Sequence, residues 1–444
     1  MKDPTLNSEF WRFLLSSILI TLSGTLGFVV DGIIVGNLIG EDGVSAINLN
    51  MPLLQFLYTI SMLLSTGAGM LVGMELGKKD FSRAAYIFTV SMALCLVVGV
   101  LFSIVGIETP DVVAGLLCSN ERLLEPTTRY LVPLLLGTPV YMMMWALSNM
   151  VSVDGSPRLV SIAIIIDNAV NLAFDIILIQ GLGMGIAGSS IASIIGHLVG
   201  IVIMCRHFFY KNNTLHFSRT HSQPAFRDII SQGAPLAVAS VCLTLLFYSA
   251  NTIVLSSLGH VGIFAFAVCL NLLQIYNLFM AGVCRTMQSL GAIQVGKGDH
   301  QAFRFLLVKS FRFITVSVAV ICILVWIEPS IISRLFGATD GEMLTASNHA
   351  LRILAIGFIP FCYIYPLMIV YKLYNHHKMA LFISFALSLT VIPVLWTMSR
   401  LAPDLLWYSY LIAYAIEALM IFTLHKLTHV RFELGQASPS NPSS

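Results

Sequence analysis

Part of the chain is repeated within it, and this repeat constrains the fold more than any single motif. Residues 40–80 recur 219 positions later. The identical pairs are Gly40 and Gly259, Gly43 and Gly262, Ala46 and Ala265, Leu53 and Leu272, Leu54 and Leu273, Gln55 and Gln274, Gly77 and Gly296, Lys78 and Lys297, and Asp80 and Asp299. Each copy runs from a glycine turn through a long apolar stretch to a basic turn. Two related apolar halves predict two homologous membrane lobes, with a ligand site at their interface.

The composition requires a bilayer. Of 444 residues, 57% are hydrophobic and 10% are charged, whereas a soluble domain carries about 25% charged residues. The net charge of +2 and the absence of basic blocks argue against a nucleic-acid partner. Eight cysteines without a CxxC spacing fit apolar filler better than disulfides or a metal site. No HExxH, Walker or GxSxG motif occurs, so we expect no enzyme activity. Because an ATP-binding motif is missing, we expect that any transport by this chain is driven by an ion gradient.

Apolar runs between polar turns predict an all-α membrane protein with twelve transmembrane helices. The first run, residues 13–39, is too long for a signal peptide and long enough to cross a bilayer. The predicted cores are 14–36, 47–71, 86–107, 128–150, 159–180, 186–208, 230–257, 261–286, 306–327, 348–370, 379–399 and 405–425. The predicted domains are an N-lobe at 1–208, a cytoplasmic inter-lobe linker at 209–229, a C-lobe at 230–430 and a disordered tail at 431–444.

The distribution of Lys and Arg predicts the orientation. With the N-terminus in the cytoplasm, eighteen of these residues fall on the inside and five on the outside, and Arg285 lies within a span. This bias supports an even number of spans with both termini cytoplasmic. Six spans per half then place the two lobes the same way up.

Asp31 lies within the first predicted span, between Val30 and Gly32. At 1.5 Å per residue it is roughly 13 Å inside the turn that begins at Gly40. A charged Asp at mid-helix is costly, and burial raises the pKa of a carboxyl group, so Asp31 is a candidate proton or cation acceptor. The alternative is a helix-end carboxylate near the outer headgroups.

A polar stripe marks the fifth span. Asp167, Asn171 and Asp175 are spaced i, i+4, i+8 and therefore share one helix face. Two carboxylates with an amide between them can hold a proton or a bare cation. The alternative is a polar seam that packs helices together. Ser189, Ser190 and Ser193 follow on the next span, where serines commonly join membrane helices.

Three further polar residues are candidates for a substrate cavity. Gln55 and Gln274 occupy equivalent positions of the repeat, so we expect them to face each other across the cavity. Arg285 lies roughly 18 Å from the inner turn at Lys297, deeper than easy snorkelling allows. It is a candidate cavity residue or one partner of a structural ion pair.

Two motifs resemble those of the multidrug and toxic compound extrusion (MATE) transporters. One is the stretch from Val30 to Gly36, with Gly40 and Ala46; the other is the stretch from Asn171 to Asp175, with the glycines that follow it. The resemblance covers essentially the whole chain. It implies two six-helix bundles in a V that alternate between inward-open and outward-open states. In the bacterial DinF-like branch it implies an ion site at Asp31, Asn171, Asp175 and Ser193.

The chain departs from the family pattern in two places. The first span has no proline, which argues against a bending mechanism that depends on one. The seventh span has no carboxylate and the tenth carries Arg352, so the C-lobe cation site of the NorM-like branch is missing, and Glu417 is the only C-lobe carboxylate expected in a span.

The resulting hypothesis is a monomeric antiporter of the bacterial inner membrane. It would export amphiphilic, often cationic, small molecules in exchange for H⁺ or Na⁺, with no other cofactor and no metal beyond Na⁺. The nearest alternative is a flippase for lipid-linked oligosaccharides from the same broader superfamily. Its phosphate-bearing substrate would favour several cavity cations, but only Arg285 lies deep in a span. A receptor or scaffold would need neither two homologous lobes nor buried carboxylates.

Overall fold

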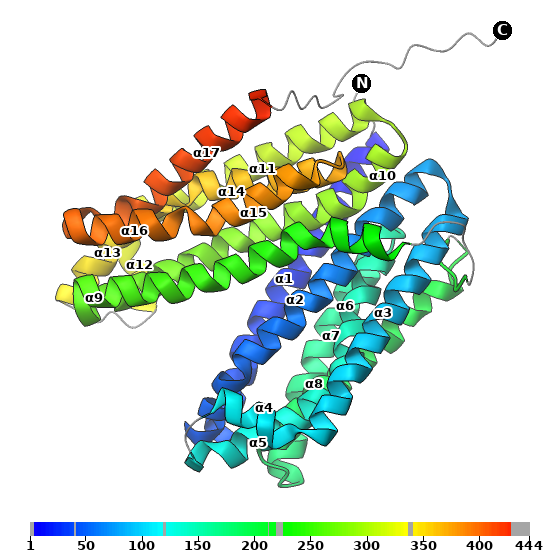
Figure 1. Ribbon diagram of the computed structural model, residues 1–444, viewed down its shortest axis with the longest axis horizontal. Coiled ribbons are helices and arrows are strands. Elements are labelled where there is room, and N and C mark those ends of the chain that lie inside the picture. The colour runs from blue at the N-terminus through cyan, green and yellow to red at the C-terminus, as the bar shows by residue number, and fades with distance from the viewer. Residues whose placement is uncertain are drawn as a thin grey trace. The chain divides into compact units, whose positions relative to one another are not determined.

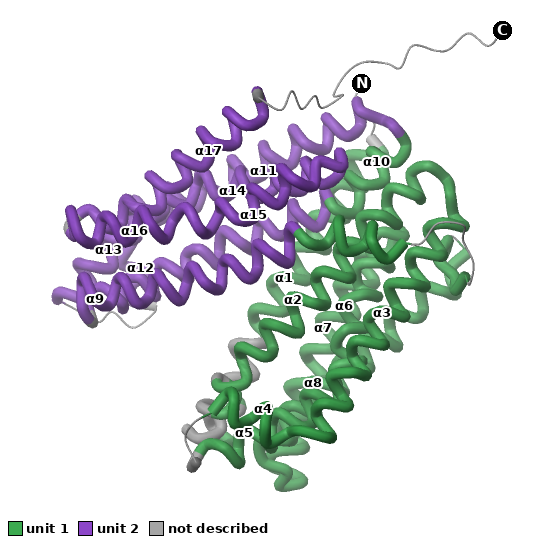
Figure 2. Tube along the Cα trace, viewed as in Figure 1, with its two compact units in different colours: residues 1–234, 288–297 green, residues 235–287, 298–444 purple. Residues whose placement is uncertain are grey.

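The structure is a computed structural model that describes residues 4–39, 41–118, 121–211, 213–218, 225–335 and 341–427. Some helix side chains, including those of 28–33 and 35–37, lie outside the described part. Within these ranges the regular elements are all helices (Figure 1). The chain divides into two compact units (Figure 2): unit 1 holds residues 1–234 and 288–297, and unit 2 holds residues 235–287 and 298–444.

Unit 1 contains the helices of the first half. They are α1 (Pro4–Ile39), α2 (Glu41–Lys78), α3 (Phe81–Glu108), α4 (Pro110–Leu117), α5 (Glu121–Leu136), α6 (Thr138–Val153), α7 (Pro157–Asp175), the π-helix η1 (Ile176–Gly181), α8 (Ile186–Cys205) and the 3₁₀-helix η2 (Arg206–Phe209). The first turns of α9 (Phe226–Thr286) and the short α10 (Ala292–Gly296) also belong to this unit. Both pack against α2 through close approaches at its glycines.

Unit 2 contains the rest of α9 and the helices of the second half. They are α11 (His300–Ile327), α12 (Pro329–Leu335), α13 (Glu342–Gly357), α14 (Ile359–Leu373), α15 (His377–Leu389), α16 (Val391–Leu401), the 3₁₀-helix η4 (Pro403–Tyr408) and α17 (Ser409–Leu427). The π-helix η3 (Met287–Gly291) joins the end of α9 to α10. Within α9, Gly259 adopts φ 63° and ψ −154°, a conformation suited to glycine, and this residue separates two spans.

The prediction of twelve spans is confirmed. Within the described ranges, eleven helices are long and apolar enough to cross a membrane, and the pair α5 and α6, bent by 51°, supplies a twelfth if it is counted as one span. Each predicted core falls on one of these helices or on a bent pair. The bend between α5 and α6 precedes Pro139, and a milder break between α13 and α14, within one span, precedes Pro360. Proline removes a backbone donor and cannot continue the preceding turn, so both breaks follow from the sequence.

The repeated basic turns have the same local structure in both halves. Asp80 accepts a hydrogen bond from the backbone N–H of Arg83, and Asp299 accepts one from that of Ala302, so each aspartate caps the helix that follows. The residue before each cap is left-handed, with φ 64° at Lys79 and φ 70° at Gly298. The sequence repeat is therefore also a repeat of backbone geometry.

Candidate functional site

The polar stripe of the fifth span lies on α7 and is buried in unit 1. Asp167, Asn171 and Asp175 are 4%, 9% and 0% exposed. Because they follow one another at intervals of one helical turn, all three project from the same face of α7. These polar groups are therefore enclosed within the described part of unit 1, where their high cost in lipid is avoided.

The facing helix, α8, carries a second polar stripe. Nδ1 of His197 lies 2.9 Å from each carboxylate oxygen of Asp167. One turn further along α7, Asn171 Nδ2 donates to Ser193 Oγ at 3.1 Å. The partner's residue number falls by four along α8 when the residue number on α7 rises by four, so the two helices are antiparallel. The next step of this register places Asp175 level with Ser189, which is 1% exposed.

These contacts bring together Asn171 and Ser193, two of the four predicted ion-site residues, and Asp175 follows one turn further along the same face of α7. Asn171, Asp175 and Ser193 lie along the contact between α7 and α8, and Asp167 extends the same row by one turn. Two carboxyl groups, one amide and one hydroxyl provide oxygen ligands of the kind that hard cations prefer. The hydrogen bonds across the row also join α7 to α8, which is the packing role of the alternative interpretation.

Sequence reasoning missed His197, although a signal was present. Ser189, Ser193 and His197 are spaced i, i+4, i+8, the same spacing as the stripe on α7. The serines alone indicate only general contacts between helices, whereas the histidine completes their row. The ring of His197 also packs edge-on against Tyr141, with 4.3 Å between ring centroids.

Helix α1 packs along α7 in a regular register. Ser161 Oγ donates to the carbonyl oxygen of Ser16 at 3.0 Å, and Asn168 Nδ2 donates to Ser23 Oγ at 3.0 Å. In each pair the two residues are 145 positions apart in the sequence, so α1 and α7 run parallel. Asp31 belongs to α1, eight residues beyond Ser23, and its side chain lies outside the described residues.

The predicted cavity residues lie in different units. Gln55 is an exposed residue of α2 in unit 1, and Gln274 is an exposed residue of α9 in unit 2. Their predicted approach across a cavity stays a prediction. Arg285 lies near the end of α9 and is half-buried.

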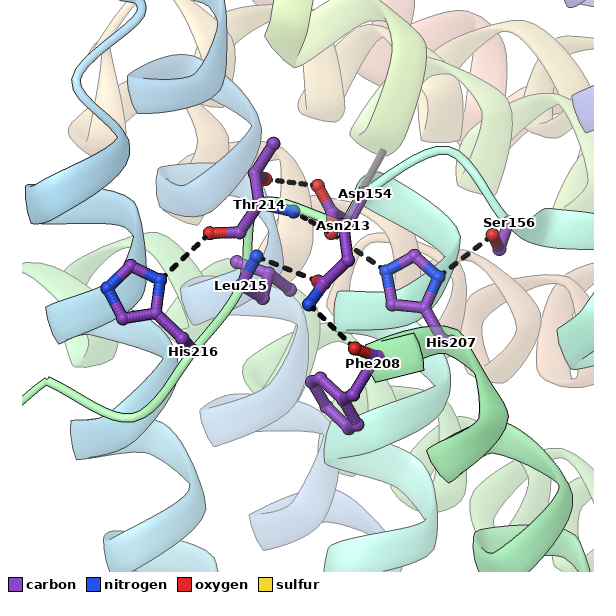
Figure 3. Close-up of polar contacts among 8 residues, drawn as sticks. All are labelled: Asp154, Ser156, His207, Phe208, Asn213, Thr214, Leu215 and His216. Atoms are coloured by element: carbon purple, nitrogen blue, oxygen red, sulfur yellow. Dashed lines mark hydrogen bonds and ion pairs between the residues drawn. The ribbon is translucent and has the colours of Figure 1, made fainter. Parts of the chain in front are cut away.

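A second polar cluster in unit 1 holds the beginning of the predicted linker (Figure 3). The buried His207 contacts Asp154 Oδ2 through Nε2 at 2.8 Å and Ser156 Oγ through Nδ1 at 2.9 Å. Thr214 donates to the same carboxylate through its backbone N–H at 3.0 Å and through its hydroxyl. Asp154 therefore ties the end of α6 to both η2 and the segment after it.

Further contacts attach the described residues of the predicted linker to unit 1. The backbone N–H of Ser218 donates to Thr89 Oγ1 at 2.9 Å, and Phe217 packs on Phe88 of α3 with 5.3 Å between ring centroids. At the beginning of α9, Asp228 pairs with Arg83 at 3.3 Å. Phe217 and Ser218 are therefore attached to α3 of the same unit.

Two charged residues of unit 2 are completely buried. Lys372, near the end of α14, and Glu417, in α17, are each 0% exposed, and neither has a hydrogen-bond partner among the described residues for its charged atoms. Lys372 is one of the eighteen Lys and Arg residues that the sequence assigns to the inner side. In the structure its side chain is enclosed within the bundle near the end of α14.

Comparison with known protein families gives one model that matches both halves of the chain. The family described as MatE matches residues 16–177 and 235–397. The two matched segments begin 219 residues apart, the same distance that separates the copies of the internal repeat.

Similar proteins cover most of the chain. The multidrug export protein MepA of Staphylococcus haemolyticus is 25% identical over 368 residues, 80% of each chain. The protein of the same name from Staphylococcus aureus strain RF122 is 23% identical over 295 residues, which span 64% of this chain and 65% of that protein.

Solved structures share the fold at lower sequence identity. A MATE crystal structure in the bent conformation has a TM-score of 0.86 at 16% identity and covers 95% of both chains. The MATE multidrug transporter DinF-BH has a TM-score of 0.83 at 20% identity and covers 96% of both chains. A MOP superfamily transporter from Pyrococcus furiosus, described as having a binding pocket of reverse polarity, has a TM-score of 0.85 at 15% identity and covers 95% of this chain and 96% of its own.

Proposed function

The chain belongs to the MatE family of membrane transporters, and from this premise we propose that it is a multidrug efflux antiporter. It exports amphiphilic, often cationic, small molecules and takes up H⁺ or Na⁺ in exchange. Relatives named as multidrug export proteins support the export of drugs. The proposed location is the bacterial inner membrane with both termini in the cytoplasm, which the bias of Lys and Arg supports.

The observation that carries the proposal is the buried row of oxygen-bearing side chains between α7 and α8. Asp175 is 0% exposed, and Asn171 and Ser193 lie one turn away in direct contact with each other. In a membrane protein such groups are expensive, so they are typical of ion pathways and proton relays. We assign the coupling ion to Asp31, Asn171, Asp175 and Ser193.

The packing of α1 on α7 supports the inclusion of Asp31. Two hydrogen-bonded pairs relate the helices by 145 residues. The same register continued along both helices brings backbone position 31 level with residue 176, next to Asp175. A carboxylate on each helix at this level would share one cation or one proton between α1 and α7.

Coupling follows from a difference in ion affinity between two conformations. An ion that binds one arrangement of α1, α7 and α8 more tightly shifts the population toward it. Because such coupling is reciprocal, substrate binding in the other arrangement weakens ion binding, and exchange results. The ion gradient then supplies the free energy for export.

Transport by purified protein in proteoliposomes tests the proposal. We expect a cationic dye to move against its gradient when a proton or sodium gradient is imposed, and separate gradients distinguish the two ions. Asp31→Asn and Asp175→Asn should abolish this movement. Ser190→Ala is the matched control, since Ser190 is buried on α8 and its hydroxyl donates within that helix, to the carbonyl oxygen of Ala187. Gradient-driven transport at the normal rate in Asp175→Asn would contradict the proposed site.

A further inference from the structure

Unit 2 contains an open groove between α11, α14 and α17. Its volume is about 340 Å³, and its walls include Phe311 of α11, Leu367 and Tyr371 of α14, and Ala418, Ile421 and Phe422 of α17. The residues on α17 are spaced i, i+3, i+4, so they form one face of that helix. The groove therefore runs along the helices rather than across them.

The groove is apolar over most of its length. Phe422 is 56% exposed and Ile421 is 5% exposed, so one wall residue faces outward while its neighbour forms the floor. Phe311 stacks flat on Tyr363, with 5.9 Å between centroids and 5° between planes, and this pair forms another part of the wall. A long apolar groove of this kind, on a helix bundle that spans a membrane, matches the shape and chemistry of an acyl chain.

One end of the groove is polar. There Tyr371 Oη and His425 Nδ1 lie 2.9 Å apart, and both residues line the groove. The ammonium group of Lys426 lies 4.5 Å from the centre of the Phe422 ring, on the wall of the groove. Lys426 is exposed at the end of α17, so its charge reaches the mouth of the groove.

The same end of unit 2 collects other basic residues. Tyr374, just after α14, contacts the rings of His300 and Phe303, which places the beginning of α11 at this end. Arg304, seven residues before Phe311 and therefore on the same face of α11, is exposed. This end thus combines the charges of Lys426 and Arg304 with the imidazole of His425.

Among the described residues, no carboxylate lines the groove beside this charge. Asp299 accepts a hydrogen bond from Ala302 and caps α11. Glu417 is completely buried, two turns of α17 away from His425, and does not line the groove. The groove therefore has an apolar body and a positive mouth.

We propose that this groove binds one anionic phospholipid. An acyl chain lies along Phe311, Ile421 and Phe422, and the phosphate lies at the mouth beside Lys426, His425 and Arg304. Basic pockets between transmembrane helices at the level of the headgroups are typical sites for anionic lipids. The positive mouth disfavours an amphiphilic cation, so this site is separate from the proposed path of exported drugs.

Native mass spectrometry of the full-length protein in detergent tests the site. The protein is titrated with phosphatidylglycerol or with phosphatidylcholine of the same acyl chains. We expect one phosphatidylglycerol to bind several-fold more tightly than phosphatidylcholine. Lys426→Gln should weaken phosphatidylglycerol binding roughly fivefold, the effect of one basic residue near a headgroup, and leave phosphatidylcholine unchanged.

Two tryptophan variants test the groove itself. Ile421→Trp fills the floor and should remove the tight lipid, whereas Leu419→Trp, at a residue 66% exposed on the same helix, should not. Equal affinity for the two lipids, or unchanged phosphatidylglycerol binding in both Ile421→Trp and Lys426→Gln, would overturn the proposal. Displacement of phosphatidylglycerol by a lower concentration of a cationic dye would overturn it in favour of a drug site. Because Lys426 is exposed, its variant remains informative if Ile421→Trp does not fold.

Discussion

Both carboxylate oxygens of Asp167 lie 2.9 Å from Nδ1 of His197, and this contact joins α7 to α8 inside unit 1. Removing the Asp167 carboxylate leaves Nδ1 of the half-buried His197 without this partner. Asp167→Ala should therefore lower the free energy of unfolding by about 1–3 kcal/mol. In a His197→Phe background, which keeps a ring beside Tyr141, the same change should cost much less. Chemical unfolding in detergent of the wild type, Asp167→Ala, His197→Phe and the double variant measures this non-additivity. Additive changes in the free energy of unfolding would show that the contact contributes nothing.

Close packing of α1 against α7 depends on the absence of a side chain at Gly27. A Cβ atom there would lie 2.5 Å from Asn168 Oδ1, whereas a Cβ atom at Gly24 would meet nothing within 4 Å. Gly24→Ala should stabilise the protein by up to about 1 kcal/mol through helix propensity. Gly27→Ala should instead destabilise it, because Asn168 must move and its bond to Ser23 is disturbed. Thermal unfolding of the pair provides the test, and equal melting temperatures would contradict the packing argument.

The repeated turn predicts a stabilising substitution. Lys79 has φ 64°, where a Cβ atom is strained, while its counterpart Gly298 has φ 70° without that strain. Lys79→Gly should raise the free energy of unfolding by about 1 kcal/mol, since the left-handed region costs non-glycine residues about 1–2 kcal/mol. Gly298→Lys should lower it by a similar amount. Opposite shifts in melting temperature are expected, and shifts of the same sign would show that the two turns are not equivalent.

The buried ammonium group of Lys372 opposes folding of unit 2. Its side chain is 0% exposed, and Nζ has no hydrogen-bond partner among the described residues. Lys372→Met keeps the side chain's length and removes the amino group, so it should stabilise the protein by about 1–3 kcal/mol, the cost of a buried polar group without a hydrogen-bond partner. Lys211→Met, at an exposed position, is the control and should change stability little. A lower melting temperature in Lys372→Met would show that the charge is compensated.

Asp154 holds the segment 213–218 on unit 1 through His207 and Thr214. Asp154→Ala removes the acceptor for both, so this segment should detach more often. Limited trypsin digestion at the exposed Lys211 should then proceed faster than in the wild type. His216→Ala is the matched control, because its imidazole is exposed and contacts the carbonyl oxygen of Thr214 rather than α6 or η2. Equal rates of digestion in the two variants would contradict the role of Asp154.

Helix periodicity was sufficient to predict the row on α7. Asp167, Asn171 and Asp175 share a face in any α-helix, and the cost of exposing them to lipid requires that face to be buried. Which residues meet that row could not be predicted in the same way. The contacts of His197 and Ser193 depend on the rotation of α8 and on its antiparallel register with α7, and neither is a local property of the sequence.

The order of apolar runs, glycine turns and capping residues determined the helices and their two-fold repetition. A chain in lipid must satisfy its backbone hydrogen bonds within each span, so the length and composition of the apolar runs are sufficient to locate the membrane helices. Only the tertiary structure decided that Lys372 is enclosed, that Asp167 contacts His197 and that the segment after η2 folds back onto α3. Those outcomes depend on which helix faces approach each other, and side-chain packing between segments distant in the sequence sets that choice.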